Sequence, residues 1–183
     1  TWLARQLAER GATVTRMLTI PDDRALIAEW VARFAADFDA VIVTGGLGDT
    51  PDDVTVEAVA DAFDREMTVQ ASVRETVAEK ARRYREQNPE RYEQHDFDLD
   101  FDETAALPEG ARPLQTEASF NPGCVVENVY VFPGFPEELR TMFGTVAAEF
   151  DGDVVTESVP TVTPEGALKD VLDGVRDRFD VAV

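Results

Sequence analysis

The stretch VIVTGGLGDTPDDVT, residues 41–55, decides the fold because it joins an apolar run to a glycine-rich turn and an amphipathic segment. A short continuous apolar run that ends in glycine is typical of a strand buried on both faces. Apolar residues then recur at helical spacing over residues 52–63. The stretch therefore predicts a buried strand, a tight turn and a helix.

Helices and strands alternate on both sides of this stretch. Helical spacing predicts further helices over residues 2–11, 22–38, 69–87, 136–150 and 164–178. Alternation and β-branched residues predict strands over residues 12–21, 96–103 and 153–160, a strand or hairpin over 125–134, and a strand start at 180–183. This order predicts an α/β protein, a three-layer α/β/α sandwich with a mainly parallel mixed sheet and a small extra segment around residues 85–125.

Composition limits the classes of protein to which the chain can belong. Its 183 residues, 44% of them hydrophobic, are enough for one core, so we expect a single domain over residues 1–183. The one cysteine, Cys124, excludes an internal disulfide framework and a cysteine-based zinc cluster, and it is expected as a small buried apolar residue. No stretch of eighteen apolar residues and no secretory signal is visible, so a cytoplasmic protein is expected.

The charge points away from nucleic acids. Thirty-seven acidic residues against seventeen basic ones give a formal net charge of -20, which repels nucleic-acid backbones and anionic membranes. The acidic residues are spread along the whole chain, which suits a halophilic protein whose surface charge is screened by salt. We therefore expect a small-molecule partner and neither nucleic acid nor membrane.

The turn after the buried strand has two interpretations. Gly45, Gly46 and Gly48 allow positive φ angles and leave backbone N–H groups open to an anion. The spacing matches neither a dinucleotide-binding loop nor a Walker A loop, and the Walker lysine is missing. The glycines alone thus fit either a phosphate-binding loop or a tight turn.

The paired aspartates after the glycines also have two interpretations. Thr50, Pro51 and Asp53 have the order of a helix cap, in which Asp52 and Asp53 complement the helix dipole. Alternatively, the two carboxylates hold Mg²⁺, which commonly binds proteins through one or two carboxylates together with substrate phosphates. In that case backbone N–H groups and the metal share the anion.

Two motifs in the right order make this chain similar to a known family. TGGLGDTPDDVTVEAVA resembles the signature T-G-G-x-G followed by D-x-T-x-E-A of the molybdopterin-binding fold, which the MoaB and MogA proteins share with the N-terminal domain of CinA. Downstream, LPEGA, NPG and PGFPEE, at residues 107–111, 121–123 and 133–138, resemble the CinA branch. The resemblance extends more weakly over the whole chain and implies that segments precede Thr1 and follow Val183.

The resemblance implies a site as well as a fold. The glycine loop would hold the phosphate of a molybdopterin or the pyrophosphate of an adenine nucleotide. The residues placed at this ligand are Thr44, Gly45, Gly46, Leu47, Gly48, Thr55, Pro122, Gly123, Pro133 and Gly134. Asp53, with Asp52, would support Mg²⁺-dependent catalysis, and Glu138 would either cap its helix or ligate the metal.

The implied activities are a role in molybdenum cofactor biosynthesis, as a molybdopterin adenylyltransferase, or Mg²⁺-dependent cleavage of ADP-ribose. The alternatives are a non-catalytic nucleotide- or pterin-binding module and an oligomeric scaffold. Dimers and trimers both occur among such relatives, so a homo-oligomer is expected.

The chain departs from the family pattern in two places near the expected ligand. Asp49 stands where CinA-like sequences have proline, and it adds negative charge beside the presumed phosphate. Ser119, Phe120 and Asn121 replace a small G-T-A sequence before Pro122, which would reshape the pocket. The acidic segment at residues 96–105 also replaces basic and amide groups of CinA relatives, against the pyrophosphatase activity.

Overall fold

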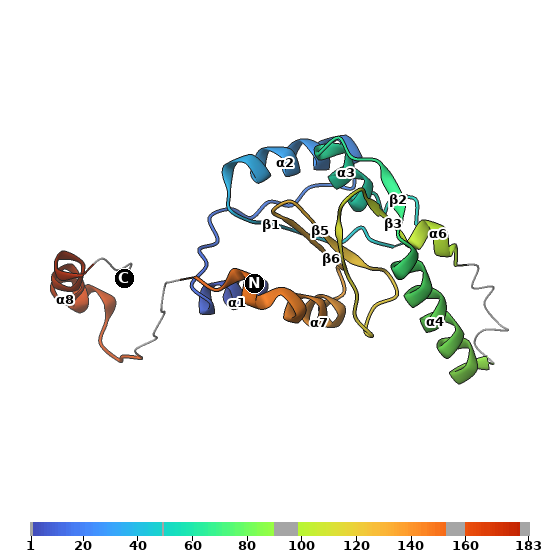
Figure 1. Cartoon of the computed structure of the whole chain (residues 1–183). Helices are drawn as coiled ribbons and strands as arrows, with labels where there is room; N and C mark the ends of the chain where they lie inside the picture. Colours follow the sequence, from blue (N-terminus) through green and yellow to red (C-terminus); the bar gives the residue numbers. More distant parts are fainter. Residues whose placement is uncertain (1, 49, 90–98, 153–159, 180–183) are drawn as a thin grey trace. The chain divides into compact units, whose positions relative to one another are not determined.

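The computed structural model describes residues 2–48, 50–89, 99–152 and 160–179 (Figure 1). The chain divides into two compact units, one made of residues 14–151 and the other of residues 1–13 with 152–183. The second unit contains helices α1 (Trp2–Glu9) and α8 (Glu165–Arg178), both close to their predicted ranges. The predicted strands at 153–160 and 180–183 fall almost entirely outside the described residues.

The larger unit is built on a four-stranded mixed sheet in the order β1-β6-β5-β4. These strands are β1 (Val41–Thr44), β6 (Val129–Phe132), β5 (Gly123–Val126) and β4 (Arg112–Leu114). β1 pairs with β6 in parallel, whereas β6–β5 and β5–β4 are antiparallel, so the antiparallel share is larger than expected. The hairpin over 125–134 is confirmed, with Glu127 at a φ of 50° in its turn.

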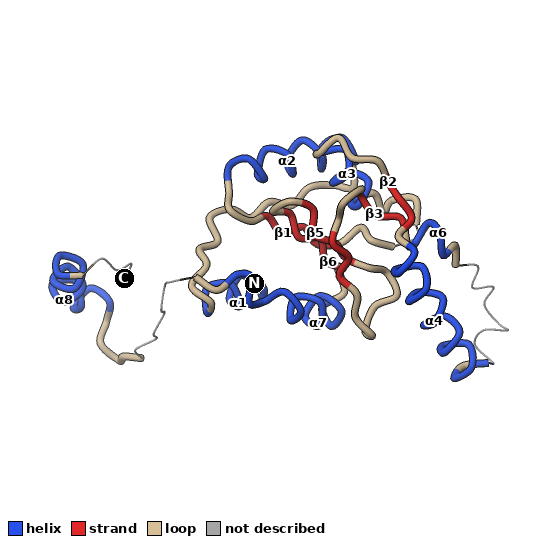
Figure 2. Tube along the Cα trace, in the orientation of Figure 1, coloured by secondary structure: helices blue, strands red, loops and turns tan. Residues whose placement is uncertain are grey.

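Helices cover both faces of this sheet, which confirms the α/β class (Figures 1 and 2). α2 (Arg24–Asp37) and α3 (Thr55–Ala62) lie on one face, and α7 (Pro136–Val146) with the short 3₁₀ helix η1 (Ala147–Phe150) lies on the other. Asp23 caps α2 by accepting the N–H of Leu26 at 3.0 Å. No helix in the described part of the chain is both long and apolar enough to cross a membrane.

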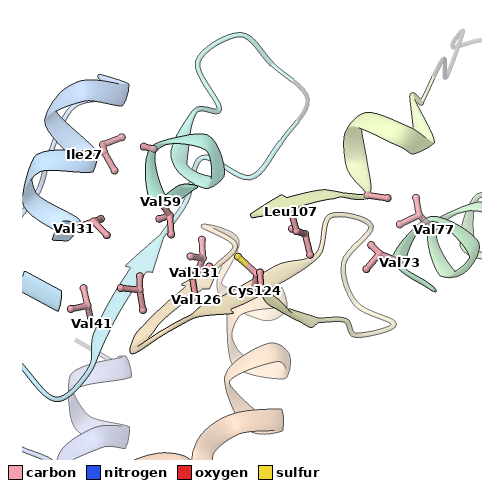
Figure 3. Packing of buried hydrophobic residues seen from close by; sticks show 14 residues of the cluster. Ile27, Val31, Val41, Val59, Val73, Val77, Leu107, Cys124, Val126 and Val131 are labelled. Carbon is pink, nitrogen blue, oxygen red and sulfur yellow. The ribbon is translucent and has the colours of Figure 1, made fainter. Parts of the chain in front are cut away.

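The core fills the space between α2, α3 and the sheet (Figure 3). Ile27 and Val31 of α2, Val59 of α3 and Val131 of β6 all belong to this buried cluster, which extends to α4 (Ala71–Gln87). Cys124 is fully buried in the same core, and burial raises the pKa of its thiol to about 12. Cys124 is thus a small apolar core residue, as predicted.

A second sheet has two strands, one that precedes the extra segment of residues 85–125 and one that lies within it. β2 (Met67–Val69) pairs with β3 (Ala106–Pro108) in antiparallel fashion, and α4 (Ala71–Gln87) follows β2. The predicted strand at 96–103 is wrong where the structure describes it, because α6 (Phe101–Thr104) begins there. Asp100 caps this helix by accepting the N–H groups of Asp102 and Glu103, and a local cap of this kind competes with strand pairing.

The predicted strand at 12–21 is also wrong. Residues 12–20 form no strand, and Val14, Met17 and Leu18 are exposed. β-branched residues favour a strand only where a pleated face is buried against neighbours, and these side chains find no such face. The sheet therefore begins at β1 in the described part of the chain.

Candidate functional site

The carboxyl ends of β1 and β6 lie side by side at one edge of the sheet. Thr44 pairs with Phe132, and the N–H of Gly45 donates to the carbonyl of Phe132 at 3.0 Å. β5 runs in the opposite direction, so its first residue, Gly123, starts at the same edge. The fold thus brings three of the glycine-containing turns, at Gly45, Gly123 and Gly134, to one edge, whereas Gly110 precedes the start of β4 at the opposite end of the sheet.

The glycine loop and the turn after β6 touch each other. A Cβ atom on Gly134 would lie 3.3 Å from the Cα of Gly45. Gly45 has a φ of 93° and Gly46 a φ of 67°, conformations that side-chain-bearing residues rarely adopt. The contact between the two family motifs is therefore built from backbone atoms.

Three of the predicted ligand-binding residues sit beside or beneath this loop. A Cβ atom on Gly46 would overlap the Oγ1 of Thr55, whose N–H donates to the carbonyl of Gly46 at 3.2 Å. Thr55 is buried and Leu47 packs on the core, whereas Thr44 is exposed. Thr55 and Leu47 thus support the loop, and Thr44 lies exposed at the end of β1.

The other residues predicted to contact the ligand differ in their exposure to solvent. Pro122, Gly123 and Pro133 are buried, and a Cβ atom on Gly123 would overlap the carbonyl of Val131 and the Sδ of Met142. Gly134 is exposed. Pro122, Gly123 and Pro133 therefore lie beneath the surface of this edge, while Gly134 is exposed beside the glycine loop.

The side chain of Asp53 folds back onto the loop. Its Oδ2 accepts the N–H of Thr50 at 3.2 Å and lies at hydrogen-bond distance from the Thr50 hydroxyl. The hydrogen bond from that hydroxyl, aided by the N–H groups of Gly48 and Thr50, lowers the pKa of Asp53 from its usual 3.8, against partial burial. Asp53 is therefore an ionised group that fixes the shape of residues 48–53.

Asp52 approaches the same hydroxyl. The Thr50 Oγ1 lies 2.6 Å from Oδ1 of Asp52, so two carboxylates surround one hydroxyl. A hydroxyl has a single hydrogen and can donate it to one of them. The pair thus concentrates negative charge at the edge of the loop; Asp49 falls outside the described residues.

The predicted helix cap at Thr50 is wrong. α3 begins at Thr55 with Val54 as its N-cap, and that cap makes no side-chain hydrogen bond. Residues 50–53 form a separate turn instead, in which the N–H of Asp53 donates to the carbonyl of Thr50 at 2.8 Å. Glu57, rather than either aspartate, is the acidic residue in the first turn of the helix.

Glu138 is the third residue of α7, whose N-cap Phe135 provides no side-chain hydrogen bond. Its side chain is half-buried. Across the described ranges, no three acidic, histidine or cysteine side chains gather as a metal-binding group. Metal ligation by Glu138 therefore stays a prediction.

Sequence reasoning missed several features of the structure, at this edge and elsewhere. Phe135 is 74% exposed beside the turn after β6, although an aromatic residue between Gly134 and Pro136 was visible in the sequence. Lys80 of α4 is buried, and its spacing from Val73 and Val77 could have shown that it shares their face. A hollow of about 540 Å³ at the other end of the sheet, near Phe63 and Asn128, lies away from the glycine loop.

Comparison with known proteins agrees with this geometry. A family model described as a probable molybdopterin binding domain matches residues 1–151. A protein from Archaeoglobus fulgidus is 33% identical over 184 residues, which cover all of this chain and 74% of that protein. A CinA-like protein from Thermotoga neapolitana is 30% identical over 192 residues, which cover 99% of this chain and 45% of that protein.

A solved structure is similar as well. The crystal structure of the protein CinA, with unknown function, from Thermoplasma acidophilum matches with a TM-score of 0.67 and 22% identity. The match covers 81% of this chain and 85% of that one. This likeness shows the shared fold. The chain spans less than half of the Thermotoga neapolitana protein, so the comparison concerns only that part of it.

Proposed function

The chain belongs to the family of probable molybdopterin-binding domains, and from that premise we propose that it binds a small phosphorylated ligand where β1 and β6 end. The ligand is a phosphorylated pterin, such as molybdopterin, or an adenine nucleotide. The observation that carries the proposal is the contact between the partly buried Gly45 and the exposed Gly134, which brings two backbone turns together at the carboxyl edge of parallel strands. Ligands of open α/β sheets bind at this edge.

Backbone N–H groups of the loop are the anion donors. The N–H of Gly45 donates to the carbonyl of Phe132, and the N–H of Gly48 donates to the carboxylate of Asp53. No described residue accepts the N–H of Gly46 or of Leu47. We therefore assign these two N–H groups to the phosphate, a narrower set than the whole loop from Gly45 to Gly48. Consecutive N–H groups in such turns form anion-binding concavities.

Asp52 and Asp53 fit a magnesium ion beside that phosphate. Their carboxylates converge on the Thr50 hydroxyl, which is neutral and can donate its one hydrogen to only one of them, so the negative charge of both is retained. Two carboxylates are a sufficient protein contribution when phosphate oxygens complete the coordination. A bound Mg²⁺ would neutralise charge on the phosphate and polarise its oxygens. The protein's own part is to hold the two carboxylates and the N–H donors in fixed positions.

Turnover and simple binding remain distinct versions of this function. In the enzyme version, Asp53 and Asp52 support Mg²⁺-dependent cleavage of ADP-ribose or adenylylation of molybdopterin. In the carrier version, the same loop holds the ligand without reaction. A protein of net charge -20 favours a small ligand accompanied by a cation over a nucleic acid, and we expect it to act as a cytoplasmic dimer or trimer.

Calorimetric titration tests the proposal. ADP-ribose, ATP and molybdopterin are titrated in high salt, with and without Mg²⁺, and each complex is assayed for product. We expect at least one ligand to bind and Mg²⁺ to tighten its binding. Binding without product identifies the carrier version. If none of the three binds under either condition, the proposed function is wrong.

A further inference from the structure

The loop of residues 115–121, between β4 and β5, holds an unusual set of buried polar atoms. Gln115 Nε2, Thr116 Oγ1 and Asn121 Oδ1 are buried without a hydrogen-bond partner, and they are all such side-chain atoms within the described residues. Buried polar atoms left unpaired destabilise the folded state because they lose their hydrogen bonds to water and gain none in return. Three of them within seven residues indicate that something else completes their hydrogen bonds.

Helix α4 fixes the backbone of this loop. The Lys80 ammonium donates to the carbonyls of Thr116 at 2.6 Å and Ser119 at 2.8 Å. Burial lowers the pKa of Lys80 from 10.5, against an opposing attraction to Glu117. The carbonyl groups and the ammonium thus satisfy each other, and the loop is held to α4 from within.

Two outer contacts add to this attachment. Arg83 pairs with Glu117 at 2.9 Å, and the rings of Tyr84 and Phe120 meet edge to face at 5.9 Å. Because these contacts use other groups, the side-chain atoms of Gln115, Thr116 and Asn121 are left over in a loop that is otherwise anchored. The three atoms are covered in this structure, so a ligand must displace what covers them, while the anchored backbone limits the further ordering that binding requires.

The strand register places this loop at the edge that carries the glycine loop. Leu114 pairs with Gly123, Cys124 pairs with Val131, and Thr44 pairs with Phe132. One row across the sheet therefore contains the end of β4, the start of β5, the end of β6 and the end of β1. The start of β5 lies two strand spacings, roughly 10 Å, from the end of β1.

We propose that Gln115, Thr116 and Asn121 form a second subsite, which binds the polar edge of a heterocyclic ring whose phosphate occupies the glycine loop. The proposal rests on the proposed function and names the part of the ligand that determines specificity. An amide N–H donor, a hydroxyl and an amide oxygen acceptor suit a purine or pterin, whose ring edges present adjacent donors and acceptors. A cation is disfavoured at this subsite because the Lys80 ammonium is bound to the same loop.

Asn121→Leu tests the subsite, with Gln115→Met as a second variant. Both substitutions keep side-chain size and remove an unpaired polar atom, so the fold is expected to hold. Calorimetry compares ADP-ribose and AMP, which carry an adenine ring, with ribose 5-phosphate and pyrophosphate, which lack a base. We expect each variant to weaken the affinity for adenine-bearing ligands about tenfold, as the loss of a specific base contact does, and to change the affinity for base-free ligands less than about twofold.

Glu117→Gln is the matched control, since Glu117 lies on the same loop, is exposed and contacts Arg83. It should leave the affinity for both groups of ligands unchanged. If Asn121→Leu and Gln115→Met weaken both groups equally, or neither group, the subsite is wrong while the phosphate site stands. If the unmodified protein binds no ligand of either group, the proposed function fails and the subsite fails with it.

Discussion

Asp53 links the shape of the glycine loop to its charge. Its carboxylate accepts hydrogen bonds from Thr50, which lower its pKa and keep it ionised at the rim of the site. Asp52 adds a second carboxylate at the same hydroxyl. One short turn therefore both holds the loop closed and carries the charge that a cation beside the phosphate would balance.

Asp53→Asn should lower the free energy of unfolding at pH 7, because the amide accepts the Thr50 hydrogen bonds less strongly than a carboxylate does. The folded-state pKa lies below the usual 3.8, so this stabilisation is complete above pH 3.8 and disappears as the pH falls through the folded pKa. Urea unfolding of both proteins at pH 7 and at progressively lower pH measures the difference. A difference that stays constant below pH 3.8 would contradict this role of the charge.

The same variant separates the two functions of Asp53. If the enzyme version of the proposed function holds, Asp53→Asn should abolish Mg²⁺-dependent turnover. An unchanged rate would show that Asp53 is no metal ligand and serves the loop alone.

Gly46→Ala should lower the free energy of unfolding by about 2–3 kcal/mol, because it combines a left-handed φ with a collision against Thr55. Gly144→Ala is the matched control: its Cβ atom meets open space on α7, and alanine should stabilise that helix by about 0.5–1 kcal/mol. Denaturant titration of both variants measures the contrast. A Gly46→Ala protein as stable as the parent would show that the loop has a different conformation.

The strands β1, β6 and β5 position the site together, because the ends of β1 and β6 and the start of β5 meet at the same edge of the sheet. Gly123 allows α7 to approach β5, since a Cβ atom there would meet both Met142 of α7 and the backbone of β6. Phe132 and Phe143 continue this contact, with ring centroids 6.2 Å apart. Helix packing on this face therefore determines the position of the turn after β6.

Gly123→Ala should lower the free energy of unfolding by about 1–3 kcal/mol, because a methyl group is added to a filled space. It should also weaken ligand binding through displacement of β6, while secondary structure content by circular dichroism stays unchanged. Thermal unfolding and calorimetry together check the effect. Unchanged stability and affinity would mean that α7 and β5 are further apart than the structure places them.

Much of this edge could be predicted from the sequence because local signals and glycine spacing carry it. The apolar run before Gly45 and the amphipathic helix begun by Pro136 correctly indicated two elements that flank the site. The start of α3 was wrong by three residues, since Asp53 bonds back to Thr50 and not forward to the helix. Side-chain direction at such a turn depends on loop geometry that no periodic pattern encodes.

Contacts between residues far apart in the chain could not be predicted from the sequence. Lys80 stands in a charged helix and gives no local sign that its ammonium binds carbonyls 36 and 39 residues later. The exposed strand-like segment at residues 12–20 failed for the opposite reason, since its local pattern was clear but no sheet face received it. Tertiary context decided both cases.

At the scale of the whole molecule, net charge is the dominant feature. A charge of -20 on 183 residues opposes compaction through self-repulsion, which dissolved salt screens within about 10 Å at 0.1 M and about 3 Å at 1 M. The ion pairs between Arg24 and Asp61 and between Arg112 and Glu149 are exposed and contribute little by themselves. The folded state should therefore depend on ionic strength more than a neutral protein of the same size would.

Raising KCl from 0.1 M to 2 M should increase the melting temperature. Each 1 kcal/mol of relieved repulsion corresponds to about 2–4 °C for a chain of this length. Differential scanning calorimetry at several KCl concentrations measures the trend, and sucrose at matched osmolality controls for water activity. A melting temperature that is constant or falls with KCl would show that the acidic surface does not limit stability.

The most direct test of the central claim is residue-resolved NMR of ligand binding. ¹⁵N-labelled protein is titrated with ADP-ribose and with pyrophosphate in the presence of Mg²⁺, and backbone amide shifts are followed. We expect the amide signals of Gly46 and Leu47 to shift most with both ligands, because their N–H groups bind the phosphate. Saturable binding that leaves these two amides unchanged would contradict this expectation.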